Sequence, residues 1–550
     1  MRLFKNIFSN LYFNYILLFI ALLYSFVFIF FGIDFTDTFY YINLCKDYTS
    51  SPMIILTLLI GKGWMSLFGD SLISFRVLNW AIWILSILLP FIILIPSNFR
   101  RENLKYVSLS IFLMTILNFN VFGGDGCTLV FLALSTSLII KYYQTGKLIH
   151  LLLYGLSSSL LILVRFPNIL ILPASVVIFS IIEYSKIFKI LQKRKILISY
   201  FKKIGIYFVV NIGFYVLINL LVYGSISEFI TKLTFSILNT DENHNLLSMV
   251  RGYVIDSIKI IQYIGVCFLI YTIVNNRLIS NLSVQRALKI SVFVFIILFL
   301  KIEIGIGKYN WNISLFYSAI VSSLLIFYSI FYIKREEYYR LVFISIIFIF
   351  AIIPATGSTT GLLKISPFLV AFLPILPASN QNVINKFSQL SYLFALFFLF
   401  VIYTKMTVVY EDSKITDLKY ELKTGKLNHI RTTRVNVDFI TDVLQEFEKN
   451  ITDNKNVLFY GKVSHVFYYL TNTKPLYQNS FWMPPYDTKE IKKAEQIIVS
   501  KKPVVIFVPS YPENSAQYFN DRKTISPFET MLIKNGYIVS SKNSFIIYNP

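Results

Sequence analysis

The sequence predicts a polytopic α-helical membrane protein, with about thirteen transmembrane helices, that ends in a small α/β domain. The 550 residues are 56% hydrophobic and only 15% charged, and the mean hydropathy is +0.64. A soluble domain is about one quarter charged. Long apolar runs recur as far as residue 405, whereas the chain beyond Tyr403 is polar and alternates between short apolar and charged stretches. Lipid is therefore the solvent of most of this chain.

The predicted helices follow from the length of the apolar runs, because a helix needs about 20 residues to cross a bilayer. Residues 1–405 are expected to form the membrane module and residues 406–550 an extracytoplasmic domain. The predicted spans lie at 11–32, 72–95, 105–121, 128–141, 149–165, 168–184, 204–223, 254–274, 290–306, 311–333, 340–356, 363–379 and 388–407.

The orientation follows from the basic residues. The net charge of +22 would fit a nucleic-acid partner. However, Lys and Arg are concentrated in alternate loops, and the segment 186–203 alone carries seven of them and no acid. Since cytoplasmic loops hold the excess of Lys and Arg, we expect a cytoplasmic N-terminus and an extracytoplasmic C-terminal domain. No nucleic-acid partner is expected, and the segment 186–203 is either an ordinary cytoplasmic anchor or a contact with anionic lipid.

The location in the cell rests on composition. The abundance of Ile, Lys, Asn and Phe is typical of AT-rich bacterial genes. A bacterial cytoplasmic (inner) membrane is the favoured location, and the endoplasmic reticulum is the alternative.

The C-terminal region alternates helices and strands, which is typical of a small α/β domain. It contains no glycine-rich phosphate loop, nucleophile elbow or metal-ligand spacing, so a structural or acceptor-docking role is expected. The predicted elements are helices at Val437–Asn450, Ile491–Ser500 and Ser526–Asn535, and strands at Val457–Tyr460, Val504–Val508, Tyr537–Ser540 and Ser544–Tyr548.

Ionisable residues near the spans gather at the predicted outer face. The first outer loop, 33–71, begins GIDFTDTFYYI and contains an amphipathic stretch, Pro52–Phe68, that is expected to lie in the interface. The second outer loop, FGGDGCTL, is short and places Asp125 between glycines. An ion-coupled transporter would need charged groups near the midplane. Charge at one interface instead suits substrates with a lipid tail and a polar head.

These outer segments resemble those of the GT-C membrane glycosyltransferases. The features shared with that superfamily are an acidic residue followed by aromatic residues after the first span, the segment LFGDSLISFRVLN before the second span, a short acidic second loop, LVRFPN at the end of the fifth span, and a C-terminal outer domain. The protein O-mannosyltransferases and the lipid A aminoarabinose transferase are the most similar in layout.

The resemblance implies transfer of a sugar, with inversion, from a polyprenyl-phosphate donor to an extracytoplasmic lipid, glycan or protein acceptor. The catalytic base of the family aligns best with Asp37, because Tyr40 and Tyr41 follow at the expected distance. Asp34 is the rival, and both acids would share one face if the segment is helical. Asp125 corresponds to the family's second-loop acid, which binds donor or acceptor or assists a metal.

The same resemblance requires cations for the lipid phosphate. Arg165 is the first candidate, followed by Arg76, Lys301, Lys308 and Lys364, and the segment Ala355–Lys364 (ATGSTTGLLK) offers further donors. A divalent ion, Mg²⁺ or Mn²⁺, would use Asp37 and Asp125. Thr38 stands where the family commonly has Glu, which weakens that case because such ions prefer several carboxylate oxygens.

Other functions remain open at this point. A flippase or exporter of lipid-linked sugars or polysaccharide is the main alternative, and it would be expected to show repeated halves and polar residues deep in the spans. A scaffold with a partner-binding outer domain and a polysaccharide ligase or polymerase are the others.

Overall fold

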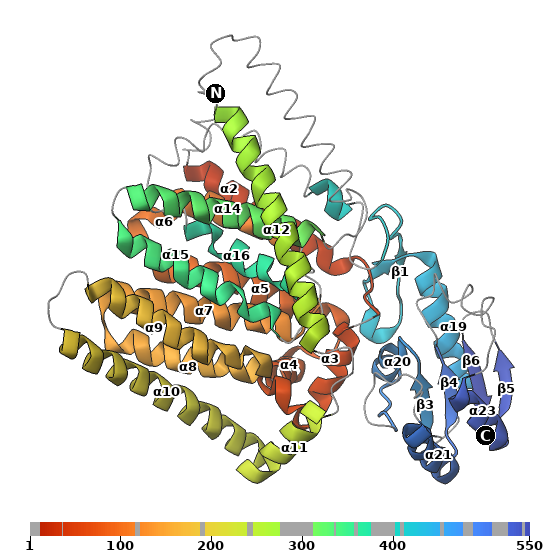
Figure 1. The fold of residues 1–550 in the computed structure, drawn as a ribbon. Coiled ribbons are helices and arrows are strands. Elements are labelled where there is room, and N and C mark those ends of the chain that lie inside the picture. The colour runs from red at the N-terminus through yellow and green to blue at the C-terminus, as the bar shows by residue number, and fades with distance from the viewer. Residues whose placement is uncertain are drawn as a thin grey trace.

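The computed structural model shows a helical body with a small sheet-containing module beside it (Figure 1). It describes residues 11–35, 37–115, 121–187, 193–238, 246–275, 312–334, 337–356, 361–375, 402–406, 412–450, 456–476, 488–508, 526–541 and 545–550.

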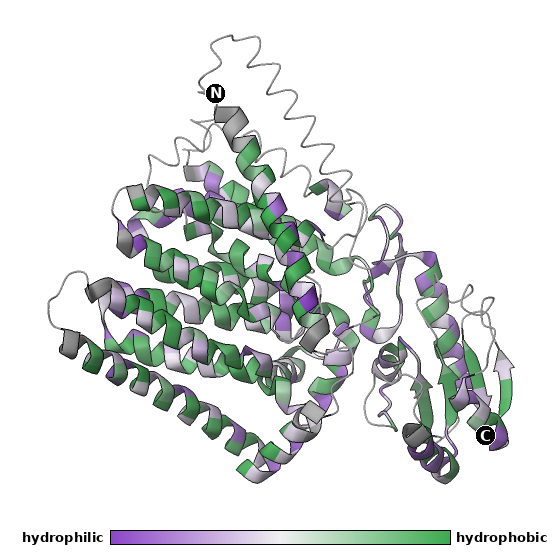
Figure 2. Cartoon of the chain, in the orientation of Figure 1, coloured by the Kyte–Doolittle hydropathy of each residue, from purple (hydrophilic) through white to green (hydrophobic). Residues whose placement is uncertain are grey.

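The helical body is built from apolar helices because lipid offers the backbone no hydrogen-bond partner, so each segment satisfies its own N–H and C=O groups. Most of its residues are hydrophobic, whereas hydrophilic residues are frequent on α19 and α21 of the sheet-containing module (Figure 2). The helices of the body are α2 (Leu11–Val27), α5 (Leu72–Leu94), α6 (Ser97–Met114), α7 (Gly124–Thr145), α8 (Leu148–Val164), α9 (Ile171–Ile187), α10 (Lys193–Tyr223), α12 (Leu246–Asn275), α14 (Asn312–Lys334), α15 (Tyr338–Ala351) and α16 (Ile365–Phe372).

Small residues allow these helices to approach closely. A Cβ atom on Gly126 of α7 would lie 2.8 Å from Asn79 Oδ1 of α5, and one on Gly155 of α8 would lie 2.9 Å from Val210 Cγ1 of α10. Close packing of this kind stabilises helix pairs in lipid, where apolar side chains gain little from leaving the solvent.

The structure confirms a mostly helical chain with apolar helices suited to a multi-pass membrane protein. Within the described ranges, seven helices are long and apolar enough to span a membrane, and four shorter apolar helices accompany them. The count of thirteen stays a prediction, since 290–306 and most of 388–407 lie outside those ranges. Several helices begin before the predicted span, such as α7 at Gly124 rather than at residue 128.

The segment predicted as the first outer loop, 33–71, is largely helical and lies at the end of the body that faces the sheet-containing module (Figure 1). It contains α3 (Asp37–Lys46), two 3-10 turns, η2 (Tyr48–Ser50) and η3 (Pro52–Ile54), and α4 (Ile55–Phe68). The helix predicted at Pro52–Phe68 is thus present as η3 and α4, and its interfacial position stays a prediction. At the same end, α11 (Ile226–Leu238) contacts η3 and was not predicted.

The C-terminal module contains a four-stranded sheet in the order β3-β4-β6-β5. β3 (Val457–Tyr460) pairs in parallel with β4 (Val504–Phe507), which is antiparallel to β6 (Ile546–Asn549), itself antiparallel to β5 (Ile538–Ser541). The predicted strands therefore occur within one or two residues of their expected ends. The other elements are β1 (Tyr420–Glu421), η11 (Gly425–Leu427), β2 (Arg431–Thr432), α19 (Arg434–Asn450), α20 (Ser464–Thr471), α21 (Thr488–Lys501) and α23 (Pro527–Lys534).

Both faces of this sheet are buried, and they belong to different cores. Val457 and Phe459 of β3 join the large core that runs through the helical body, whereas Leu458 and Tyr460 join a second core with residues of α21 and α23. Because successive side chains of a strand point to opposite faces, one face of the sheet is packed toward the membrane helices. The two parts of the chain therefore share one continuous core.

Glu529 offers a test of this packing. Its backbone N–H and side chain form a capping box with Ser526, and its Oε1 accepts a 2.5 Å hydrogen bond from the Tyr548 hydroxyl of β6. We predict that Glu529→Ala lowers the free energy of unfolding by about 2–4 kcal/mol, since Ser526 N and the buried Tyr548 hydroxyl both lose their carboxylate acceptor. The measurement is thermal unfolding of the purified protein in detergent. The control Glu448→Ala removes an exposed acid from α19 and should leave the melting temperature unchanged; equal melting temperatures for the two variants would contradict the prediction.

Candidate active site

Helix α3 carries the first predicted acid. Asp37 lies in the first turn of α3 and Asp34 lies just before it. The two acids would share a helix face only if both lay in one helix. The helix begins at Asp37, so they do not. Asp34 is 2% exposed, and its Oδ2 accepts hydrogen bonds from Thr38 N (3.3 Å) and Thr38 Oγ1 (2.9 Å). Asp34 thus satisfies a backbone N–H group of the first helical turn that has no partner within the helix.

Asp37, by contrast, is exposed. Desolvation by the surrounding protein atoms and the negative charges of Asp34 and Asp125 raise the pKa of its carboxyl group, the positive charge of Lys364 lowers it, and the net pKa is about 6. A carboxyl group with this pKa is mostly ionised at neutral pH, yet more basic than an ordinary aspartate.

Tyr41 connects α3 to the second predicted acid. A Cβ atom at Gly123 would lie only 2.7 Å from Tyr41 Cε2, and one at Gly124 would lie 3.8 Å from the Tyr41 hydroxyl. The ring therefore lies against the glycines at the start of α7, and larger residues there would push α3 away. Burial and the charges of Asp125 and Asp37 raise the pKa of Tyr41, so its hydroxyl remains a hydrogen-bond donor. The neighbouring Tyr40 ring lies edge-on to it at 5.8 Å.

Asp125, in the first turn of α7, binds two cations from different parts of the chain. Its Oδ2 lies 2.7 Å from Lys364 Nζ, and its Oδ1 lies 3.6 Å from Arg165 Nη1. The Asp125 side chain is 52% exposed. The cluster of Asp125, Arg165 and Lys364 therefore has one positive charge in excess and is open to a ligand.

Arg165 lies where the chain leaves the helical conformation between α8 and the 3-10 turn η4 (Phe166–Leu170). Its neighbours are held by side chains of other elements: Thr57 Oγ1 of α4 donates to Val164 O at 3.0 Å, and the buried Asn168 Nδ2 donates to Thr128 Oγ1 of α7 at 2.9 Å. Arg165 itself donates through Nη1 to Pro354 O at 3.1 Å. Its position is thus determined by α4, α7 and the segment at 354.

Lys364 ends the 3-10 turn η7 (Gly361–Lys364), which α12 holds in place. Asp256 Oδ2 of α12 accepts a hydrogen bond from Leu362 N at 2.9 Å, and the Tyr253 hydroxyl donates to Ala355 O at 2.7 Å. Gly361 has φ +63°, and a Cβ atom there would lie 2.3 Å from Asp256 Oδ2. Glycine is favoured here, because a side chain would be strained at this φ and would displace the Asp256 carboxylate. Asp256 was not predicted as a site residue, although a carboxylate inside an apolar run was a signal for it.

Arg76 does not join this cluster. Its side chain is 2% exposed, and it donates hydrogen bonds to the carbonyl oxygens of Ile29 (2.8 Å), Phe31 (3.3 Å) and Gly32 (2.8 Å). The buried guanidinium group satisfies carbonyl groups at the end of the first membrane helix, so the geometry favours a structural role. Lys301, Lys308 and residues 357–360 of the predicted donor loop lie outside the described residues.

The candidate metal ligands do not fit a divalent ion. In the part of the chain that the structure describes, no group of three or more His, Cys, Asp or Glu side chains lies close enough to hold one. Both oxygens of Asp125 face cations, which would repel a second cation. The site is therefore better suited to an anion between Arg165 and Lys364.

Comparison with known proteins gives distant structural similarities. No protein-family model and no curated protein matches the sequence. An oligosaccharyltransferase from Archaeoglobus fulgidus, solved with Zn and sulfate, is 11% identical with a TM-score of 0.48 over 97% of this chain and 73% of that chain. ArnT from Cupriavidus metallidurans is similar over 97% of both chains, at 9% identity and a TM-score of 0.43 in the apo state and at 10% and 0.36 when bound to undecaprenyl phosphate. Both are GT-C enzymes, the superfamily that the sequence resembles. At these identities and scores, the function of this chain rests on its own residues.

Gly361 allows a test of how Lys364 is positioned. We predict that Gly361→Ala costs about 1–2 kcal/mol from the left-handed backbone alone, with a further cost from displacing Asp256. The expected result is a lower melting temperature and faster proteolysis near residue 361. Gly213→Ala on α10 is the control, because nothing lies within 4 Å of its Cβ position and its φ is not positive. A Gly361→Ala variant as stable and as protease-resistant as the control would disprove the close contact.

Proposed function

We propose that this protein is an integral-membrane glycosyltransferase that moves a sugar from a polyprenyl-phosphate donor to an extracytoplasmic lipid, glycan or protein acceptor. The observation that carries the proposal is the juxtaposition of Asp37, a carboxylate of raised pKa, with the cationic cluster of Asp125, Arg165 and Lys364. Base and cations meet at one end of a set of apolar helices, where a substrate with a lipid tail can present its head group.

Asp37 acts as the general base. The acceptor hydroxyl attacks the anomeric carbon, its proton passes to the Asp37 carboxylate, and the bond from the anomeric carbon to the phosphate oxygen breaks with its electron pair on that oxygen. A single displacement of this kind inverts the anomeric centre. A hydroxyl group is a poor nucleophile, so a base within hydrogen-bond reach accelerates the step. Asp34 serves as a positioning residue, since its carboxylate is buried against Thr38.

Arg165 and Lys364 stabilise the leaving phosphate. Negative charge grows on the phosphate oxygen as the bond breaks, and cations already fixed in place stabilise it without reorganisation. Asp125 holds these two cations together and orients them, and Tyr41 offers a hydroxyl donor beside the start of α7.

The proposal includes the side of the membrane on which the active site lies. We place the active site and the C-terminal module, residues 406–550, on the outer side of a bacterial cytoplasmic membrane, as the distribution of Lys and Arg predicts. Residues 1–405 form the catalytic membrane module with about thirteen spans. The site and the C-terminal module lie at the same end of the helical body (Figure 1), so an acceptor on that side reaches both.

Substitutions of the base and of a cation should differ in their effect on KM. We predict that Asp37→Asn lowers kcat by about 10²–10⁴-fold with little change in KM, whereas Arg165→Met both lowers kcat, because the growing charge on the phosphate loses a cation, and raises KM for the donor. The measurement is sugar transfer from a polyprenyl-phosphate sugar to extracted envelope acceptors in vesicles containing the purified protein. Asp442→Asn, an acid of α19 remote from the site, is the control. Full activity of Asp37→Asn would refute the catalytic role. Movement of donor lipid across the membrane without transfer by the parent protein would identify a flippase instead.

The raised pKa of Asp37 predicts the pH dependence. The base works only when ionised, so kcat should rise with pH through about 6 and then level off. Because Lys364 lowers the pKa of Asp37, Lys364→Met should move this rise to higher pH. Lys232→Met, which removes an exposed lysine of α11, should leave the midpoint unchanged. A parent profile that is flat through pH 6, or an unmoved midpoint in Lys364→Met, would contradict the assignment.

A further inference from the structure

The C-terminal module contacts the chain immediately before α3. Asp412 Oδ2 accepts a hydrogen bond from Ile33 N at 3.0 Å, and Arg431 O accepts one from Gly32 N at 2.8 Å. Asp412 is in turn held by the Thr432 hydroxyl (2.5 Å) and by Asn436 Nδ2 (3.2 Å). The segment is thus fixed to the module from one side, while the Arg76 guanidinium holds its carbonyl groups from the other.

The module also packs against the residues on each side of Asp37. Phe35 is 2% exposed, and its ring lies edge-on to Phe439 of α19 at 6.0 Å. Phe39 is fully buried, and its ring lies 5.1 Å from that of Tyr469 of α20. Aromatic pairs of this kind contribute about 0.5–1.5 kcal/mol beyond the area that they bury. Asp37 therefore lies between two phenylalanines, Phe35 and Phe39, that both pack against aromatic rings of the C-terminal module.

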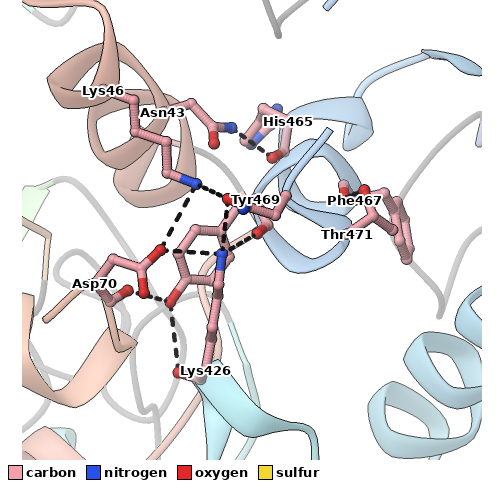
Figure 3. A network of polar contacts seen from close by, with 9 residues as sticks. Asn43, Lys46, Asp70, Lys426, His465, Phe467, Tyr469 and Thr471 are labelled. Atoms are coloured by element: carbon pink, nitrogen blue, oxygen red, sulfur yellow. Dashed lines mark hydrogen bonds and ion pairs between the residues drawn. The ribbon is translucent and has the colours of Figure 1, made fainter. Parts of the chain in front are cut away.

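A polar network fixes the other end of α3 (Figure 3). Asn43 Nδ2 donates to His465 O of α20 at 2.8 Å, and Lys46 Nζ donates to Asn472 Oδ1 at 2.8 Å. Asp70, which precedes α5, joins the network: its Oδ2 lies 3.0 Å from Lys426 Nζ, and its backbone oxygen accepts a 2.6 Å bond from the Tyr469 hydroxyl. Partly exposed ion pairs contribute little on their own, so the orientation of α3 depends on the whole set.

We propose that the C-terminal module positions the catalytic helix α3, with Asp412 as the positioning residue at its start; this rests on the proposed role of Asp37. The module thereby acts on the reaction without contacting the substrate. It holds Asp37 at a fixed distance from the Arg165–Lys364 pair. It also keeps in place the protein atoms that exclude water from the Asp37 carboxyl group. A displacement of about 1 Å at such a group can cost on the order of 100-fold in rate.

The test is Asp412→Ala in the full-length protein, measured in two ways. Amide hydrogen exchange is expected to become faster at residues 31–46 and to stay unchanged in α8. Sugar transfer is expected to lose at least tenfold in kcat with KM for the donor near its parent value. The rise of kcat with pH should also move to lower pH, since a freer Asp37 is better hydrated. A loss of folded protein alone would reduce the amount of active enzyme without moving the pH profile.

The controls separate the possible failures. Asp438→Ala removes an exposed acid of α19 that pairs with Arg434 across one helical turn, and it should change neither exchange nor transfer. If Asp412→Ala does not fold, Asn43→Ala, which removes the bond to His465 O, should give the same pattern more weakly. Unchanged exchange at residues 31–46, or an unmoved pH profile, would overturn the positioning role. Exchange does not depend on catalysis, so it still tests this inference if the parent protein transfers no sugar.

Discussion

The Asp125 carboxylate is the interaction on which the rest of the candidate site depends. It joins the start of α7 to Arg165 at the end of α8 and to Lys364 at the end of η7. Without it, two cations would repel each other at an apolar interface where screening by water is weak. The site is therefore assembled at helix ends, where backbone N–H and C=O groups have no partner within the helix. Its charged side chains do not need to lie at the centre of the helical body.

The backbone carbonyl groups at a helix end also explain the position of Arg76. A single guanidinium group offers several donors in a fixed geometry, and here it binds three carbonyl groups within four residues at the end of the first membrane helix. The sequence offered no way to distinguish this use from phosphate binding, because both need an arginine beside the outer loop. Only the depth of burial decides between them.

Prediction from the sequence succeeded where the signal is local. The run VLFY predicts β3, and the helix predicted at Ser526–Asn535 is present as α23. Helix α20 was missed because its sequence SHVFYYLT is rich in aromatic residues and is buried on all sides, so it shows no helical periodicity. In the site, Asp37, Asp125, Arg165 and Lys364 were all named in advance. Asp256 and Asp412 were not, since their roles depend on contacts with Leu362 and Ile33, 106 and 379 residues away in the chain.

The long sequence separation between α3 and its supports also bears on how the protein is made. Asn43 bonds to a residue 422 positions later, and Phe35 and Phe39 pack on helices that follow the last membrane segment. During synthesis, the first outer loop must therefore wait for nearly the whole chain to be inserted before it reaches its final geometry. A chain interrupted before the C-terminal module would carry Asp37, Asp125, Arg165 and Lys364 and would still lack the contacts that orient α3.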